Sequence, residues 1–283
     1  MKPNWIRVKL PSGEKYHSLK TLSEGLQLNT VCQEARCPNI EECWNGGTAT
    51  FMLMGDTCTR GCRFCHVKTG NPKGVLDLEE PRKIAQAIQE LQLKYVVLTS
   101  VDRDDLPDGG ASHFSRTVHE IKKINSEITV EALIPDFNAD PKSLDTMLES
   151  GAEVLAQNME TVKRLTKKVR DHKSGYEKTL HVLEYFKTKK SSIVTKSSLM
   201  VGLGETEAEI FETMDDLRSI GVDILTLGQY LQPSKKQLPV ECYVHPSYFE
   251  KLKDVGMKKG FRYVAAGPLV RSSYRAGEFF KWK

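Results

Sequence analysis

The sequence contains no apolar run long enough to span a bilayer, and its first residues lack the continuous apolar core of a signal peptide. It also lacks a strong net charge, because 41 Lys and Arg residues are balanced by 37 Asp and Glu residues. The resulting +4 is too small and too scattered to indicate nucleic-acid binding, although a mildly acidic protein partner is compatible with it. We therefore expect a cytoplasmic protein that binds neither membrane nor nucleic acid.

No internal repeat, low-complexity tract or linker divides the 283 residues. This length is within the range of a single α/β barrel, and 39% hydrophobic residues supply a large core. We expect an N-terminal extension at residues 1–47, a barrel at 48–230 and a C-terminal extension at 231–283.

Short β-branched or apolar runs alternate with stretches of helical spacing along the middle of the chain. Such alternation implies parallel strands with right-handed crossovers, which occur in doubly wound sheets and in full or partial barrels. We predict the α/β class and a partial, TIM-like (β/α)6 barrel. Strands are expected near residues 48–54, 95–100, 129–133, 153–157, 193–200 and 224–227, and helices near 81–93, 112–125, 141–150, 176–189 and 206–220.

Three cysteines follow the first expected strand with the spacing C-x3-C-x2-C, at Cys58, Cys62 and Cys65. One loop with this spacing can place three thiolates on three corners of an iron–sulfur cubane, which leaves one iron open. The alternative, a structural zinc site, fits poorly because zinc takes four ligands and usually uses C-x2-C pairs. His66 follows Cys65 too closely to be a convenient fourth ligand.

A second triad, Cys32, Cys37 and Cys43, has the spacing C-x4-C-x5-C and precedes the expected barrel. A second cluster is the simplest interpretation, since six cysteines within residues 32–65 of a Lys-rich chain favour metal binding over disulfides. The remaining Cys242 is isolated in the sequence, and we expect it to be a buried free cysteine.

Both triads resemble known signatures. The first triad, with Phe64 before its last cysteine, resembles the radical S-adenosylmethionine (radical SAM) signature, and residues 32–44 resemble the amino-terminal signature of lipoyl synthases. The resemblance to that family continues at residues 100–110, 133–137, 203–206, 229–233 and 267–277.

The resemblance implies two 4Fe–4S clusters and two molecules of S-adenosylmethionine per turnover. The first cluster would cleave S-adenosylmethionine, and the second, auxiliary cluster would be the sulfur source for C6 and C8 of a protein-bound octanoyl-lysine. By the same analogy Ser273, or as a second choice Ser272, completes the auxiliary cluster. The catalytic residues implied are Cys32, Cys37, Cys43, Cys58, Cys62, Cys65 and Ser273.

The expected cofactor contacts lie at the carboxyl ends of strands, where barrel enzymes gather their chemistry. A solvated loop is an alternative for Asp102 and Arg103, and a tight turn followed by a Thr206–Glu209 capping box is an alternative for the glycine segment. Gln157 stands where the family commonly has His, so no acid–base role is expected there. The expected contacts with S-adenosylmethionine are Phe64, Asp102, Arg103, Asn158, Gly202, Gly204 and Glu205.

The resemblance also implies protein partners. These are octanoylated lipoyl carrier domains, from 2-oxoacid dehydrogenase acyltransferase subunits or the glycine-cleavage H protein, an electron donor such as ferredoxin or flavodoxin, and an iron–sulfur carrier. The rival interpretations are another radical SAM sulfur-inserting enzyme, such as a biotin synthase-like or methylthio-transferring protein, and a zinc-stabilised nucleic-acid-binding module.

Overall fold

A computed structural model describes residues 2–6, 12–34, 37, 39–45, 48–274 and 276–282. Positions 35, 36 and 38 of the second cysteine motif, positions 46 and 47 at the end of the expected extension, and Arg275 lie outside the described residues. The chain separates into two compact units. We call residues 8–60, 67–155 and 275–283 the β2–β7 unit, and residues 1–7, 61–66 and 156–274 the β8–β10 unit.

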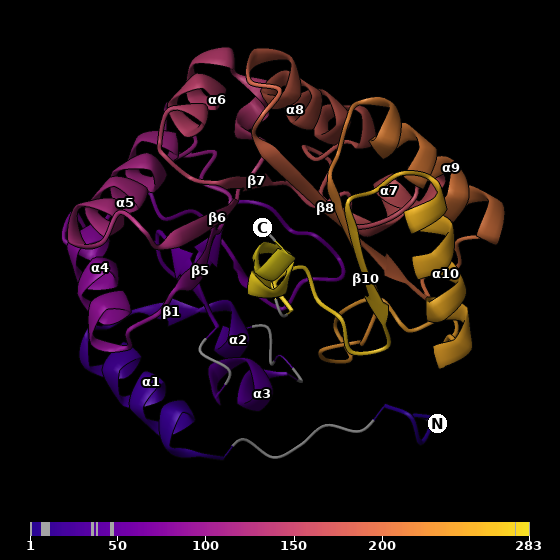
Figure 1. The fold of residues 1–283 in the computed structure, drawn as a ribbon, viewed down its shortest axis with the longest axis horizontal. Coiled ribbons are helices and arrows are strands. Elements are labelled where there is room, and N and C mark those ends of the chain that lie inside the picture. Colours follow the sequence, from indigo (N-terminus) through magenta and orange to yellow (C-terminus); the bar gives the residue numbers. More distant parts are fainter. Residues whose placement is uncertain are drawn as a thin grey trace. The chain divides into compact units, whose positions relative to one another are not determined.

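The β2–β7 unit contains strands in the order β1-β2-β5-β6-β7. β2 (Ala49–Leu53) and β5 (Tyr95–Ser100) pair in parallel, as do β5 and β6 (Thr129–Leu133), while β1 (Asn29–Thr30) is antiparallel to β2. The helices α4, α5 and α6 pack on one another in sequence along this unit (Figure 1). The unit's other elements are α1 (Glu14–Gly25), α2 (Val31–Glu34), α3 (Ile40–Asn45), β3 (Thr57–Cys58), β4 (Lys68–Thr69), α4 (Glu80–Glu90), α5 (Ala111–Ile124), η1 (Phe137–Ala139), α6 (Pro141–Leu148), β7 (Val154–Ala156) and η3 (Ala276–Trp282).

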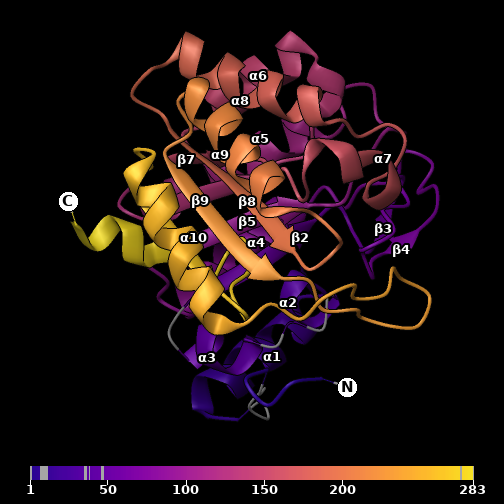
Figure 2. The same ribbon diagram turned by 90° about the vertical axis from the view of Figure 1, so that its right-hand side faces the viewer.

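The β8–β10 unit contains three parallel strands, β8 (Val194–Val201), β9 (Ile224–Gln229) and β10 (Tyr263–Gly267). Their apolar side chains form one core with those of the covering helices, and α10 lies along β9 in Figure 2. The helices of the unit are η2 (Lys163–Leu165), α7 (Thr166–Val169), α8 (Tyr176–Lys189), α9 (Glu207–Ser219) and α10 (Pro246–Lys258).

All six strands and five helices expected from the sequence are confirmed, with small shifts at their ends. The helix starts follow local rules, since Pro141 is the first residue of α6 and Thr206 caps α9 in a capping box with Glu209. β10 was not predicted, because its Ala-Ala-Gly sequence has low strand propensity. With β10, the parallel strands continue beyond the barrel expected at residues 48–230 and into the expected C-terminal extension at 231–283. None of the helices in the described part of the chain has the length and apolar character to cross a membrane.

Asp223 joins three elements of the β8–β10 unit. Its carboxylate accepts hydrogen bonds from Lys187 Nζ at 2.7 Å and from the Thr195 backbone N–H at 2.9 Å, and lies 3.6 Å from the Arg262 guanidinium. The residue is 6% exposed, so these charges interact with little screening. The carboxylate thus links α8, β8 and the approach to β10.

We expect Asp223→Ala to lower the free energy of unfolding by about 3 kcal/mol, because it removes a buried carboxylate that binds both the partly buried Lys187 ammonium and the Thr195 N–H. Asp254→Ala, at an exposed position on α10, should change it by less than about 0.5 kcal/mol. Urea denaturation measures both values. Equal stability of the two variants would remove Asp223 from this role.

Candidate functional site

Cys58 ends β3, beyond the carboxyl end of β2, and belongs to the β2–β7 unit. Its sulfur accepts the backbone N–H of Asp102 at 3.3 Å and of Arg60 at 3.4 Å. The Asp102 carboxylate lies 3.6 Å from the same sulfur. Burial raises the pKa of the Asp102 carboxyl, Arg60 opposes this effect, and Asp136 and Asp104 add to it. The predicted residues Cys58 and Asp102 are therefore in direct contact.

Arg60 is the centre of a buried charge cluster that sequence reasoning missed. Its guanidinium, 3% exposed, binds Asp136 through two bonds of 2.7 Å, binds Asp104 at 3.0 Å and lies 3.4 Å from Asp102. Burial by itself lowers the pKa of Arg60, but the hydrogen bonds to Asp136 and Asp104 outweigh it and raise the pKa. One cation thus holds together loops that follow β2, β5 and β6. The sequence signal for it was an Arg inside the cysteine motif, with acidic residues after the next two strands.

Arg103 is also buried, with 1% of its surface exposed. It donates two hydrogen bonds of 2.8 Å to Asp105 and further bonds to the carbonyl oxygens of Met54 and Val75. These contacts fix the loop after β5. The expected contact of Arg103 with S-adenosylmethionine stays a prediction.

The loop 61–66, which carries Cys62 and Cys65, belongs to the β8–β10 unit. On one side the Asp171 N–H donates to the Cys62 sulfur at 3.3 Å, and the Gly61 N–H donates to the Asp171 carboxylate at 2.9 Å. On the other side Gln237 Nε2 donates to the Cys65 carbonyl at 3.1 Å. Phe64 packs against the core of this unit. Hydrogen bonds with Asp171 and Gln237, and the packing of Phe64, therefore hold this cysteine loop in place.

Asn158 follows β7 and belongs to the β8–β10 unit. Burial raises the pKa of Glu160, Arg170 opposes the effect, and a hydrogen bond from Asn158 also lowers the pKa. The neighbouring Gln157 is 2% exposed, and its Oε1 atom has no hydrogen-bond partner among the described residues. Gln157 therefore places a buried amide oxygen, and no titrating group, beside Asn158.

The glycine segment after β8 forms a tight turn. Gly202 and Gly204 have φ angles of 97° and 101°, which strongly favour glycine. The Glu205 carboxylate accepts the N–H groups of Gly202 and Leu203, so its oxygens fix the turn. A Cβ atom at Gly202 would lie 2.2 Å from the Gln229 side chain. The predicted residues Gly202, Gly204 and Glu205 thus form one backbone feature at the carboxyl end of β8.

The second triad lies within the β2–β7 unit, with Cys32 in α2 and Cys43 in α3. Burial, together with electrostatic repulsion from Cys37 and Cys43, raises the pKa of the Cys32 thiol to about 12, against the opposing effect of the Trp44 indole. The three sulfurs are therefore close enough to interact. The buried Trp44 N–H therefore lies beside the Cys32 sulfur and has no other acceptor in the described part of the structure.

Ser272 and Ser273 belong to the β8–β10 unit and follow a segment that crosses β9 closely. A Cβ atom at Gly228 would lie 1.9 Å from the Val270 carbonyl oxygen, so only glycine allows this approach. Arg271 then donates to the carbonyl oxygens of Gln229 and Val270, both at 3.0 Å. These contacts position the two serines after the end of β9. The prediction that Cys242 is buried is wrong, because it is exposed in the chain segment between β9 and α10.

Within the described ranges, no group of three or more His, Cys, Asp or Glu side chains is placed to hold a single metal ion. Each cysteine of a cubane binds a different iron, so such a site differs from the tetrahedral environment of one ion. The donors fit a cluster, because the second triad brings two thiols close to the buried Cys32 thiol, and a bound metal deprotonates a coordinating thiol.

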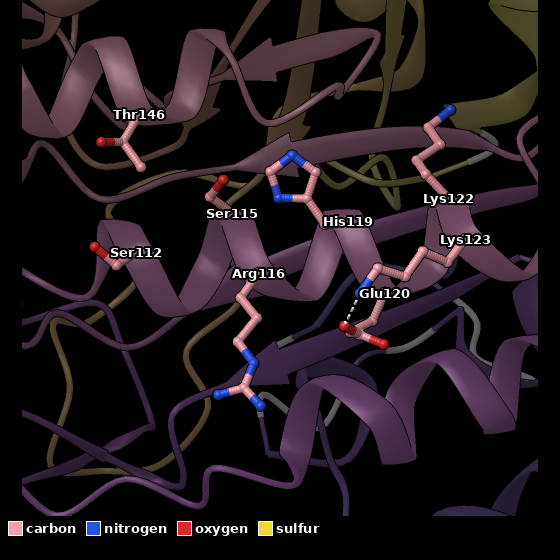
Figure 3. Close-up of a pocket in the computed structure, with 8 residues that line it drawn as sticks. All are labelled: Ser112, Ser115, Arg116, His119, Glu120, Lys122, Lys123 and Thr146. Atoms are coloured by element: carbon pink, nitrogen blue, oxygen red, sulfur yellow. Dashed lines mark hydrogen bonds and ion pairs between the residues drawn. The ribbon is translucent and has the colours of Figure 1, made fainter.

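A surface hollow of about 760 Å³ lies over α5 and α6 of the β2–β7 unit. Figure 3 shows that α5 supplies most of its lining, including Arg116, His119 and Lys123, while Thr146 comes from α6. It contains none of the predicted site residues. This hollow is therefore no part of the predicted site.

Comparison with known proteins identifies the family. A radical SAM superfamily model matches residues 52–217, and a model of the N-terminal domain of lipoyl synthase matches residues 1–37. The lipoyl synthase of Ectopseudomonas mendocina (strain ymp) is 58% identical over 280 residues, which cover 99% of this chain and 80% of that protein. The chain belongs to the lipoyl synthase family. The lipoyl synthase of Thermus thermophilus is likewise 59% identical over 279 residues, covering 99% of this chain and 86% of that protein.

The fold comparison agrees with this family. The crystal structure of methylornithine synthase (PylB) has a TM-score of 0.57 and 14% identity, and the match covers 92% of this chain and 86% of that chain. The predictions of an α/β radical SAM fold, and of a lipoyl synthase that uses S-adenosylmethionine and 4Fe–4S clusters, are confirmed. The zinc-binding nucleic-acid module is set aside, because lipoyl synthases match nearly the whole chain.

We expect Arg60→Met to lower the free energy of unfolding of the metal-free lipoyl synthase chain by about 3 kcal/mol or more, because it leaves the buried Asp136 and the partly buried Asp102 and Asp104 without their cation. Arg82→Met on α4 is the control, since that side chain is 81% exposed. Urea denaturation of both variants is the measurement. If Arg60→Met unfolds at the same urea concentration as Arg82→Met, the charge cluster is not a structural element.

Proposed function

We propose that this lipoyl synthase inserts sulfur at C6 and C8 of an octanoyl group that is amide-linked to a lysine of a carrier domain. The observation that carries this proposal is the second cysteine triad, which gathers three interacting thiols in addition to the radical SAM motif. A radical SAM enzyme that only cleaved S-adenosylmethionine would need a single triad. A second cluster that serves as the sulfur source requires its own thiol ligands, and the second triad would supply them.

Cys58, Cys62 and Cys65 would hold the first cluster, and Cys32, Cys37 and Cys43 the auxiliary one, with Ser273 as its fourth ligand. When bound, the first cluster supplies the electron that cleaves S-adenosylmethionine, and the auxiliary cluster supplies sulfur. A serine oxygen is a harder ligand than thiolate and is displaced more readily from iron that is otherwise bound by sulfur. The Arg271 contacts support this role, because they fix the backbone just before the two serines. Ser272 is the second choice.

The protein's own groups would bind and orient S-adenosylmethionine. The backbone N–H groups of Asp102 and Asp171 donate to Cys58 and Cys62, and such hydrogen bonds tune the potential of a cluster. The turn of Gly202, Gly204 and Glu205 and the amide of Asn158 would contact the methionine or ribose part. Phe64 would fix the cysteine loop by its packing. Asp102 and Arg103 would shape the wall of the site after β5.

The proposed partners follow from the same activity. They are octanoylated carrier domains of 2-oxoacid dehydrogenases or the glycine-cleavage H protein, an electron donor such as ferredoxin or flavodoxin, and an iron–sulfur carrier that rebuilds the auxiliary cluster. The cytoplasm is the proposed compartment, because six cysteines that must remain thiols suit a reducing environment. Residues 1–47 and 231–283 would supply the auxiliary-cluster ligands, and residues 48–230 the S-adenosylmethionine site.

We expect Cys58→Ala, Cys62→Ala and Cys65→Ala each to abolish cleavage of S-adenosylmethionine, because loss of one thiolate disrupts the electron-supplying cluster. Chromatographic measurement of 5′-deoxyadenosine after anaerobic incubation tests this. Cys242→Ala is the matched control, since Cys242 is exposed and lies outside both triads. Undiminished deoxyadenosine from any first-triad variant would refute the assignment.

Variants of the second triad should separate the two activities. Cys32→Ala, Cys37→Ala and Cys43→Ala, with the first cluster intact, should still form 5′-deoxyadenosine but neither the monothiolated intermediate nor lipoyl product. Ser273→Ala should resemble them, and Ser272→Ala should be milder. Mass spectrometry of an octanoyl-lysine peptide measures both products. Lipoyl product at the parent rate from a second-triad cysteine variant would require a different sulfur donor.

A further inference from the structure

Positively charged residues surround the loop that carries Cys62 and Cys65. The Arg63 N–H donates to the Val169 carbonyl at 2.9 Å, and the Leu238 N–H donates to the Arg63 carbonyl at 3.0 Å. The segments 166–173 and 234–238 therefore lie on either side of this loop, and all three belong to the β8–β10 unit. We call the following residues the basic surface: Arg63, Lys167, Lys168, Lys173, Lys235 and Lys236.

All six side chains of the basic surface are exposed. Segment 166–173 contains a single acidic residue, Asp171, and segment 234–238 contains none. The Asp171 side chain is 12% exposed and accepts the Gly61 N–H. Glu241 pairs with Lys168 at 3.3 Å, whereas Lys167, Lys235 and Lys236 have no ion pair among the described residues. The surface therefore has an excess of positive charge facing solvent.

The basic surface lies beside the loop that carries Cys62 and Cys65, and this position indicates a function for it. The Asp171 N–H contacts the Cys62 sulfur, and Gln237, directly after Lys236, contacts the Cys65 carbonyl. A protein that binds these lysines would thus lie next to the loop that carries Cys62 and Cys65, two proposed cluster ligands. Proteins that transfer electrons to each other form small interfaces and short-lived complexes, and opposite charges guide their association.

We propose that the basic surface is the docking site for a small acidic protein that carries one electron. This inference rests on the proposed function, because it takes Cys62 and Cys65 as ligands of the cluster that receives the electron. The reduced donor protein loses one electron and the enzyme gains one, with no bond made or broken. Reversal of charge on the surface should weaken docking without changing the cysteine loop, because Lys167 and Lys236 contribute no side-chain contact to that loop in the described structure.

The test compares Lys167→Glu/Lys236→Glu with the parent holoenzyme under anaerobic conditions. Calorimetric titration with an acidic 2Fe–2S ferredoxin should give a Kd about tenfold weaker for the double variant at low ionic strength. The parent's affinity should fall as salt is added, while the variant's should depend less on salt. Lys253→Glu/Lys258→Glu is the control with the same change of charge, on α10, which packs against β9 and β10, and its Kd should equal that of the parent.

A Kd for the Lys167→Glu/Lys236→Glu variant equal to that of the parent would overturn the proposal, as would an equal loss in the α10 control. Weaker binding of an octanoylated carrier domain, with ferredoxin affinity unchanged, would instead assign the surface to the substrate protein. Photoreduced deazaflavin provides electrons without any carrier protein. Lipoyl formation by the parent with this reductant therefore tests the proposed function separately, and the double variant should match the parent in that assay.

Discussion

The buried guanidinium of Arg60 is the interaction on which the site around Cys58 depends. It follows Cys58 by two residues and binds carboxylates that come after two other strands, Asp104 after β5 and Asp136 after β6. Three carboxylates, one of them fully buried, could not lie this close together without this cation. The need for charge balance therefore fixes the path of the chain as it leaves Cys58. Asp102 belongs to the same cluster and contacts the Cys58 sulfur directly, so the environment of this thiol is set by long-range ion pairs.

Much of the fold could be predicted from local patterns. Apolar runs of strand length and helical spacing located six strands and five helices, and proline and capping residues located several helix starts. The cysteine spacings located both triads, because cluster ligands on one loop must follow one another closely in sequence. The tight turn after β8 could also be expected, because two glycines follow that strand in the sequence. Their positive φ angles in the structure agree with this expectation. These features depend on neighbours within a few residues, which a sequence displays directly.

Features that depend on distant residues could not be predicted in this way. Nothing local shows that Arg60 is buried, since its partners lie more than forty residues away. β10 forms because β9 offers a parallel edge, despite the weak strand propensity of its own residues. The exposure of Cys242 depends on the path of a long connection, and the close crossing of Val270 depends on Gly228 in a different strand. In each case, contacts between residues that are far apart in the sequence determine the local structure.

The central claim is that two groups of thiols divide the work, one supporting cleavage of S-adenosylmethionine and the other supplying sulfur. Anaerobic incubation of the holoenzyme with reductant, S-adenosylmethionine and an octanoyl-lysine peptide tests it most directly by mass spectrometry. When the protein alone is labelled with ³⁴S in its clusters, the account predicts a peptide that has gained two ³⁴S atoms, with no net loss of hydrogen as the dithiol and with two hydrogens fewer after oxidation to the disulfide. A lipoyl peptide containing only unlabelled sulfur, or 5′-deoxyadenosine formed without any thiolated peptide, would contradict it.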